Sequence, residues 1–109
     1  MNGYQITFFT RQDRRHRGRP LADWLVHLAG ELGLRGATLI PASEGIGHDH
    51  RLRAARFFEL TDQPLCVLMA VTAGECARLL ERIEAEGVAV FYVRTAAEFG
   101  TTGGGNDAQ

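Results

Sequence analysis

The sequence contains no lysine, so arginine supplies all twelve of its lysine-or-arginine positions. This absence excludes a P-loop lysine and lysine Schiff-base chemistry for the chain. The basic chemistry that remains is the guanidinium group, whose forked donors suit carboxylate and phosphate. The arginines are unevenly placed, because five of them fall within positions 11–19, where only Asp13 opposes them.

Cysteine is also scarce, and the two cysteines lie in places that indicate packing. Cys66 lies in an apolar run and Cys76 at an apolar helical position, without C-x-x-C or metal-site spacing. Free cysteine is often buried in such surroundings. We therefore expect two thiols in the core.

Several motifs are missing as well. The first residues, MNGYQITFF, show no signal-peptide pattern, and no apolar run approaches the roughly 20 residues of a membrane helix. We therefore expect a cytoplasmic protein without direct membrane insertion. The net charge of -1 argues against a nucleic-acid partner. Neither G-x-S-x-G nor H-E-x-x-H is present, and we do not expect an enzyme.

Apolar periodicity predicts a strand, a helix and a strand, and then the same order again. Strands are predicted at 4–10, 36–42, 64–71 and 88–93, and helices at 20–32 and between Thr72 and Gly87. The run 64–71 is typical of a central strand buried on both faces. Pro41 indicates a sheet edge or the end of pairing, and Thr72 with Glu75 forms a T-x-x-E capping box.

This order is that of the ferredoxin-like or split βαβ arrangement, an α+β fold with an antiparallel sheet and two helices on one face. Apolar residues such as Phe9 also fall on the second face of the sheet. Packing against other copies of the chain would cover them. We assign residues 1–98 to this domain, and the Gly-rich residues 99–109 to a flexible tail.

The two halves are joined by a long segment, residues 43–64, which holds two glycines, two histidines and three arginines. Loops longer than about a dozen residues in a compact domain are usually functional or disordered. Residues 52–60 within it are compatible with a helical turn or two, or with a strand extension.

Three pieces of the sequence resemble the PII-like proteins of the domain-of-unknown-function family 190, in the superfamily of the nitrogen-regulatory PII proteins. They are GRPL at 18–21, LRGAT at 34–38 and GIG at 45–47, and the similarity runs over residues 4–96. The resemblance implies a ferredoxin-like homotrimer that binds small effectors, commonly adenine nucleotides, in the clefts between subunits. It also implies that residues 43–63 are the T-loop, which changes shape with the ligand and docks on a partner protein, often a membrane transporter or an enzyme.

The chain departs from the nitrogen-regulatory proteins after the second helix. Those proteins carry a basic loop there that grips phosphates, whereas this chain reads EAEG at 84–87. It also lacks the loop tyrosine that is uridylylated in some of them, so that modification cannot occur at this site.

Two kinds of residue are candidates for contacting an anionic effector. Gly45 and Gly47, at the base of the loop, would let backbone N–H groups approach an anion, or serve a turn that needs positive φ. The guanidinium candidates are Arg17 and Arg19 in the basic stretch and Arg51, Arg53 and Arg56 in the loop. The alternative for these arginines is a set of solvated charges, or of charges paired with the acids of the same segment.

His48 and His50 support a second interpretation. An H-x-H pair on an extended segment points both imidazoles to one side, which suits a divalent metal. The remaining ligands would come from other copies across a trimer axis. The expected function is thus a regulatory PII-like trimer that senses an anion such as an adenine nucleotide, and a divalent-metal-binding trimer is the alternative.

Overall fold

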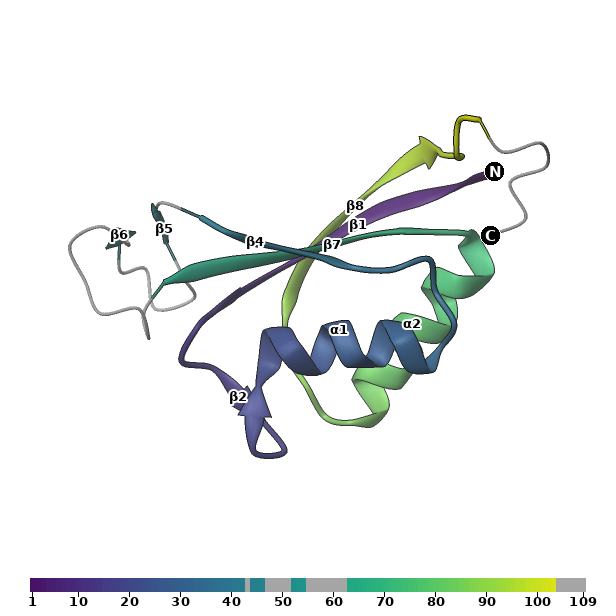
Figure 1. The fold of residues 1–109 in the computed structure, drawn as a ribbon. Helices are drawn as coiled ribbons and strands as arrows, with labels where there is room; N and C mark the ends of the chain where they lie inside the picture. The colour runs from purple at the N-terminus through teal and green to yellow at the C-terminus, as the bar shows by residue number, and fades with distance from the viewer. Residues whose placement is uncertain (43, 47–51, 55–62, 104–109) are drawn as a thin grey trace.

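The computed structural model describes residues 1–42, 44–46, 52–54 and 63–103. In chain order the elements are β1 (Asn2–Arg11), β2 (Arg15–His16), β3 (Arg19–Pro20), α1 (Leu21–Glu31), β4 (Thr38–Pro41), β5 (Glu44–Ile46), β6 (Leu52–Ala54), β7 (Pro64–Val71), α2 (Ala73–Ala85) and β8 (Phe91–Glu98). Four strands form one antiparallel sheet in the order β4-β7-β1-β8. Both helices lie on one face of this sheet (Figure 1), so the predicted βαββαβ order and the one-sided helix layer are confirmed.

The core lies between the sheet and the two helices. Alternate residues of β1 and β7 point into it, among them Ile6, Phe8 and Val67, each 0% exposed. The apolar stripe of α1 meets them with Leu25 and Leu28, and α2 adds its own buried stripe, which includes Cys76 and Leu79. The interpretation of Cys76 as a core thiol is therefore confirmed.

The central place of β7 is confirmed, since its neighbours are β4 and β1. Its burial alternates strictly between buried and half-buried positions along Pro64–Val71. In the single chain, β7 is therefore buried only on the face that the helices cover, and the prediction of burial on both faces is correct for that face alone. On the other side Cys66 is half-buried, so it is not a core thiol of the single chain.

Helix α2 begins as the sequence predicts. The backbone N–H of Glu75 donates to Thr72 Oγ1 at 3.2 Å, and the N–H of Thr72 donates to Glu75 Oε1 at 2.9 Å. The capping box thereby satisfies two N–H groups that the helix itself leaves without partners. The helix ends before Gly87, whose φ of 73° lies in the left-handed region that favours glycine.

The last strand differs from its prediction. It runs over Phe91–Glu98 and pairs with β1 from Phe9↔Phe91 to Asn2↔Glu98, whereas 88–93 was the predicted range. Val88 and Val90 are apolar because they pack against the core while the chain rises from the end of α2 to the sheet. Apolar character at these positions therefore marks a buried connection, which periodicity alone does not separate from a strand.

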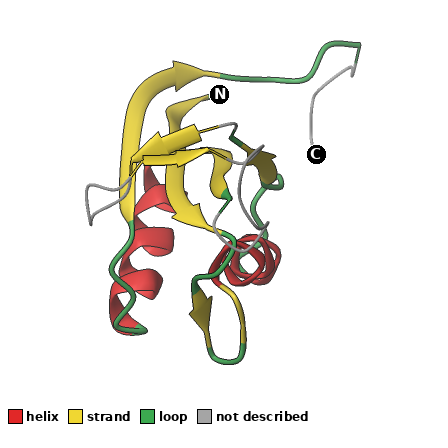
Figure 2. Cartoon of the chain, turned by 90° about the vertical axis from the view of Figure 1, so that its left-hand side faces the viewer, coloured by secondary structure: helices red, strands yellow, loops and turns green. Residues whose placement is uncertain are grey.

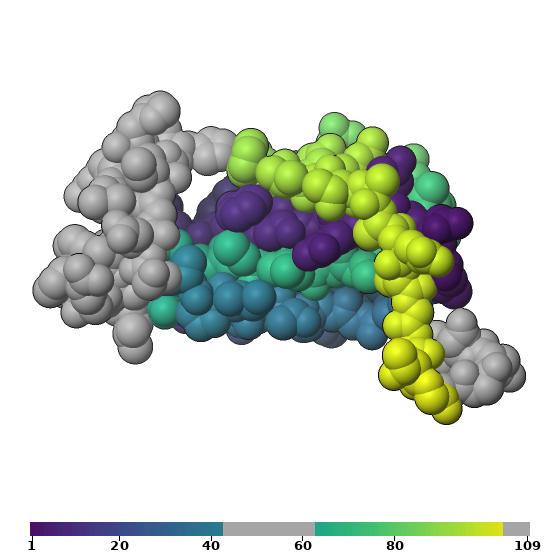
Figure 3. All heavy atoms as spheres, turned by 90° about the horizontal axis from the view of Figure 1, so that it is seen from above, coloured from purple at the N-terminus to yellow at the C-terminus, as the bar shows by residue number. Residues whose placement is uncertain are grey.

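Strand β4 is shorter than predicted but lies where Pro41 indicated, at the edge of the sheet. Its partner is β7 alone, and its pairing ends at Pro41. Leu52–Ala54 is a strand, which favours the strand option for the start of 52–60, and residues 55–60 lie outside the described residues. Figure 3 views the molecule from the side of the sheet that α1 and α2 do not cover, and all four strands lie side by side there.

Candidate functional site

The long segment leaves and rejoins the sheet at one end, beside the start of the basic stretch. The backbone N–H of Ala42 donates to the carbonyl of Pro64, and that of Gln12 to the carbonyl of Gln63, both at 2.9 Å. These bonds hold three chain segments together at the end of the sheet from which β5 and β6 extend (Figure 1). The loop base and the basic stretch both hold candidate effector-binding residues. These two segments thus begin at neighbouring positions on one end of the sheet.

At the loop base the structure brings two of the candidates together. Gly45 in β5 and Arg53 in β6 are direct cross-strand partners in a two-stranded antiparallel ladder. The other loop candidates, Gly47, His48, His50, Arg51 and Arg56, lie outside the described residues and remain predictions. Within the part of the chain that the structure describes, no three His, Cys, Asp or Glu side chains form a group that could hold a metal ion.

The basic stretch, predicted as a connection without regular structure, forms a small hairpin. Strands β2 and β3 pair through Arg15↔Pro20 and His16↔Arg19. The two residues between them have φ of 55° and 81°, the signs that a two-residue type I′ turn requires, and the second is Gly18. Figure 2 shows this hairpin projecting below the sheet, at the level of the helices. Its base is closed by the N–H of Leu21, which donates to the carbonyl of Arg14 at 2.7 Å.

The hairpin is joined to α2 by one carboxylate. Glu86, the C-cap residue of α2, accepts a hydrogen bond from His16 Nε2 at 3.0 Å and forms an ion pair with Arg17 Nε at 2.9 Å, both through Oε1. The hydrogen bond from His16 comes first among the causes that hold the pKa of Glu86 below its usual value, and the positive charge of Arg17 adds to it. The His16 ring also packs against Trp24 of α1 in a T-shaped arrangement, with ring centroids 4.7 Å apart.

The other arginines of the basic stretch, residues 11–19, differ in whether their side chains are paired. Arg11 pairs with Asp13 at 2.9 Å, and Arg15 donates to the carbonyl of Gly18 at 2.7 Å. Burial, and then the charge of Arg11, lowers the pKa of Arg14. The side chain of Arg19 is exposed and forms no hydrogen bond or ion pair with any residue that the structure describes. Among the described residues, the charge of Arg19 is therefore unpaired, whereas Arg17 is paired with Glu86.

Sequence reasoning missed Glu86 as the shared partner of His16 and Arg17. One signal was present: an acid at the C-terminal end of a helix meets the partial negative charge of the helix dipole and is unfavourable unless a cation compensates it. Glu86 lies at that position, so a basic partner was to be expected. The identity of the partner was not readable, because His16 lies 70 positions away.

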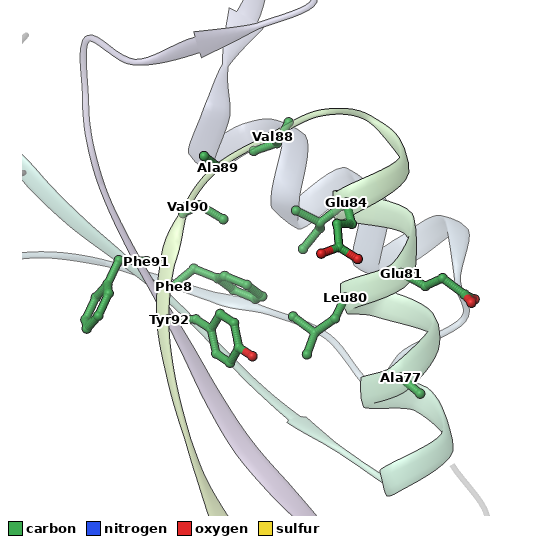
Figure 4. Close-up of a pocket in the computed structure, with 11 residues that line it drawn as sticks. Phe8, Ala77, Leu80, Glu81, Glu84, Val88, Ala89, Val90, Phe91 and Tyr92 are labelled. Atoms are coloured by element: carbon green, nitrogen blue, oxygen red, sulfur yellow. The ribbon is translucent and has the colours of Figure 1, made fainter.

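A hollow lies between α2 and the start of β8 and has a volume of about 710 Å³. Phe8, Leu80 and Tyr92 point into it, and the carboxylate of Glu84 lies at its rim (Figure 4). An apolar floor beside a carboxylate does not favour a phosphate group, since the like charges repel. We therefore do not assign the anionic effector to this hollow.

In the described residues, neither helix has the length and apolar character needed to cross a bilayer.

Comparisons with known proteins agree on one family and one fold. The profile of the domain-of-unknown-function family 190, described as "Uncharacterized ACR", matches residues 3–93. A UPF0166 protein of Aquifex aeolicus (strain VF5) is 31% identical over 80 residues, which cover 72% of this chain and 76% of that protein.

Two solved structures share the fold at low identity. A protein of Thermus thermophilus, described as PII-like and assigned to signalling, matches with a TM-score of 0.66 and 22% identity, over 88% of this chain and 87% of its own. CPII, a nitrogen regulatory PII-like protein of Thiomonas intermedia K12 bound to ADP, AMP and bicarbonate, matches with a TM-score of 0.64 and 14% identity, over 93% and 96% of the two chains. These likenesses show that the fold is PII-like.

Proposed function

The chain belongs to the domain-of-unknown-function family 190, and from this premise we propose that it is a non-enzymatic PII-like signalling module. It would bind a small anionic effector and present residues 43–63 to a partner protein. An adenine nucleotide is the first effector to test, because CPII, which shares the fold, was solved with ADP and AMP. Effector binding would favour one conformation of the 43–63 segment, and the partner protein would bind that conformation preferentially.

The observation that carries this proposal is the arrangement at one end of the sheet. The loop base and the basic hairpin start from adjacent backbone positions there, joined through Gln12 and Gln63. Gly45 and Arg53 are paired at the loop base, and Arg19 is exposed in the hairpin, so glycine backbone and arginine, residue types that can donate to an oxyanion, occur in both segments. A ligand at this end can therefore influence both the hairpin and the loop.

We also propose that three copies of the chain pack through the uncovered face of the sheet. Ile40, Cys66, Phe9 and Phe91 are successive cross-strand partners, one from each strand, and so form one apolar row across that face. Phe9 is 41% exposed, Ile40 42% and Phe91 54% in the single chain. Such a continuous apolar surface marks an interaction site. A homotrimer would cover it, as the family resemblance also implies.

Calorimetry with ATP, ADP, AMP, cyclic AMP and inorganic phosphate tests the effector proposal. We expect saturable binding of at least one nucleotide, and weaker binding after Arg53→Gln, because that change removes a guanidinium donor at the loop base. Arg78→Gln is the control: Arg78 is an exposed arginine of α2 and forms no ion pair within the described part of the chain. Failure of every nucleotide and of phosphate to bind would dismiss the anionic effector.

A further inference from the structure

Glu86 satisfies the donors of the basic hairpin as a bound oxyanion would. Its Oε1 atom lies 2.9 Å from Arg17 Nε and 3.0 Å from His16 Nε2. A guanidinium and an imidazole that converge on one oxygen atom form charge-assisted bonds suited to phosphate or carboxylate. We propose that His16 and Arg17 form an oxyanion subsite, and that Glu86 is its internal occupant, which a phosphate or carboxylate group of the effector displaces. This inference rests on the proposed function, because the displacing group belongs to that effector.

The donors of the subsite are held in place before any ligand arrives. His16 is fixed by its ladder pair with Arg19 and by the edge contact with Trp24, and its side chain is 19% exposed. Arg17 follows at the turn, and its side chain is 69% exposed. One donor is therefore anchored and the other faces solvent, so a ligand can reach the pair without rearrangement of the hairpin. Donors that are already ordered cost less entropy on binding.

Glu86 is suited to be displaced because, among the residues that the structure describes, its carboxylate pairs only with His16 and Arg17 of the hairpin. It lies at the C-terminal end of α2, where the helix dipole disfavours a negative charge. Its compensating contacts are those with His16 and Arg17. The Glu86 side chain is 19% exposed, but that of Arg17 is 69% exposed, and an ion pair with a solvent-exposed guanidinium contributes little to stability, so this pair is a weak competitor. Glu86 therefore sets a threshold for anion binding and does not block it.

The charges around the subsite favour a ligand with more than one negative charge over the single carboxylate of Glu86. Arg19 is the cross-strand partner of His16 and has no ion-pair partner among the described residues. A polyanionic group that replaces the single carboxylate gains attraction from this second guanidinium. The subsite is consequently expected to prefer a phosphate to a simple carboxylate.

The decisive variant is Glu86→Gln, with Glu84→Gln as the matched control. Both changes remove one negative charge from the last turn of α2 or its cap, but Glu84 has no ion pair within the described residues. The probes are ADP and inorganic phosphate, measured by calorimetry. We expect Glu86→Gln to bind ADP about two- to fivefold more tightly than the unchanged chain, the range that one partly exposed ion pair allows. Glu84→Gln should bind as the unchanged chain does.

Two further measurements tie the effect to the subsite. Adding Arg17→Gln to Glu86→Gln should abolish the gain in affinity, since the released donor is then missing. Trp24 is the only tryptophan of the chain, and its contact with His16 makes its fluorescence a reporter of the hairpin. ADP should shift the emission of the unchanged chain toward that of Glu86→Gln.

Each other outcome overturns a defined part of the inference. Equal ADP affinity in Glu86→Gln and the unchanged chain, or an equal gain in Glu84→Gln, removes the subsite and leaves the proposed function standing. A gain that survives Arg17→Gln, or ADP binding without a change in Trp24 emission, places the ligand elsewhere on the protein. Absence of binding by ADP and phosphate to every variant, in contrast, overturns both the subsite and the proposed nucleotide effector.

Discussion

Glu75 connects the start of α2 to the rest of the molecule through several interactions on one carboxylate. Oε1 accepts the N–H of Thr72 at 2.9 Å and the Nη1 donor of Arg35 at 2.6 Å. Burial by itself raises the pKa of Glu75. The hydrogen bond from the Thr72 backbone and the hydrogen bond and charge of Arg35 outweigh this effect together, so the pKa lies below its usual 4.5. The folded state therefore binds this proton less readily than the unfolded chain does.

The sign of the resulting pH dependence follows directly. A carboxylate with a depressed pKa stabilises the fold fully above its ordinary pKa, and this contribution is lost as the pH falls through the lowered value. We expect unfolding by urea to become easier below pH 4.5, the ordinary pKa. Glu75→Gln should be less stable at neutral pH and should show a smaller loss on acidification. Glu81→Gln, an exposed acid of the same helix, should keep the full loss, and equal pH profiles for the two variants would contradict this account.

Gly3 is required for a different reason, which is lack of space. A Cβ atom at this position would lie 2.0 Å from the carbonyl oxygen of Val71 and 2.7 Å from the Cα of Thr72. Both atoms belong to backbone where β7 passes into the cap of α2, so no side-chain rotation relieves the contact. We expect Gly3→Ala to lower the free energy of unfolding by about 1–3 kcal/mol, as overpacking does.

Gly30 provides the matched control for this prediction. It lies in α1, and a Cβ atom there would meet nothing within 4 Å. Gly30→Ala should raise the stability by about 0.5–1 kcal/mol, since alanine loses less backbone entropy in a helix. Chemical denaturation of the two variants against the unchanged chain measures both effects. Equal stabilities for the two variants would show that the close approach at Gly3 relaxes at no cost.

At the scale of elements, the strands and helices of the core were predictable from their periodicity. The stripe of α1 and the capping box at Thr72 and Glu75 are local signals, and each element that they predict is present. The hairpin β2–β3 was not predicted, because its turn places Arg17 at positive φ, which few residues other than glycine adopt. Strand β8 begins later than predicted, because Val88 and Val90 pack against the core and precede the strand.

The candidate site was less predictable than the fold. Gly45 and Arg53 were both named from the sequence, but their cross-strand pairing depends on the register of β5 and β6. The contact between His16 and Glu86 joins residues 70 positions apart. No local pattern carries such a pairing, since it depends on where the hairpin packs relative to the end of α2. The metal hypothesis for His48 and His50 and the boundary between residues 98 and 99 remain predictions.

For the whole molecule, the uncovered sheet face raises the question of assembly. Its apolar row places Cys66 next to Phe9 and Ile40, at the centre of the sheet. Cys66 is half-buried in the single chain, whereas Cys76 is fully buried by the fold itself. In a trimer packed through this face, neither thiol would be open to reagents. In a monomer, Cys66 would react before unfolding.

A maleimide assay combined with light scattering therefore tests the trimer. We expect the unchanged chain to have the mass of three copies and to show no fast-reacting thiol. Phe9→Arg places a charge in the centre of the apolar row, so it should give a monomer in which Cys66 is labelled without unfolding, although burial raises the pKa of its thiol and slows the reaction. Val26→Arg is the control, because Val26 is 36% exposed on α1, on the helix side of the molecule, and should leave the assembly intact. A monomeric unchanged chain with a reactive Cys66 would contradict the trimer, and the effector cleft between subunits would then be excluded with it.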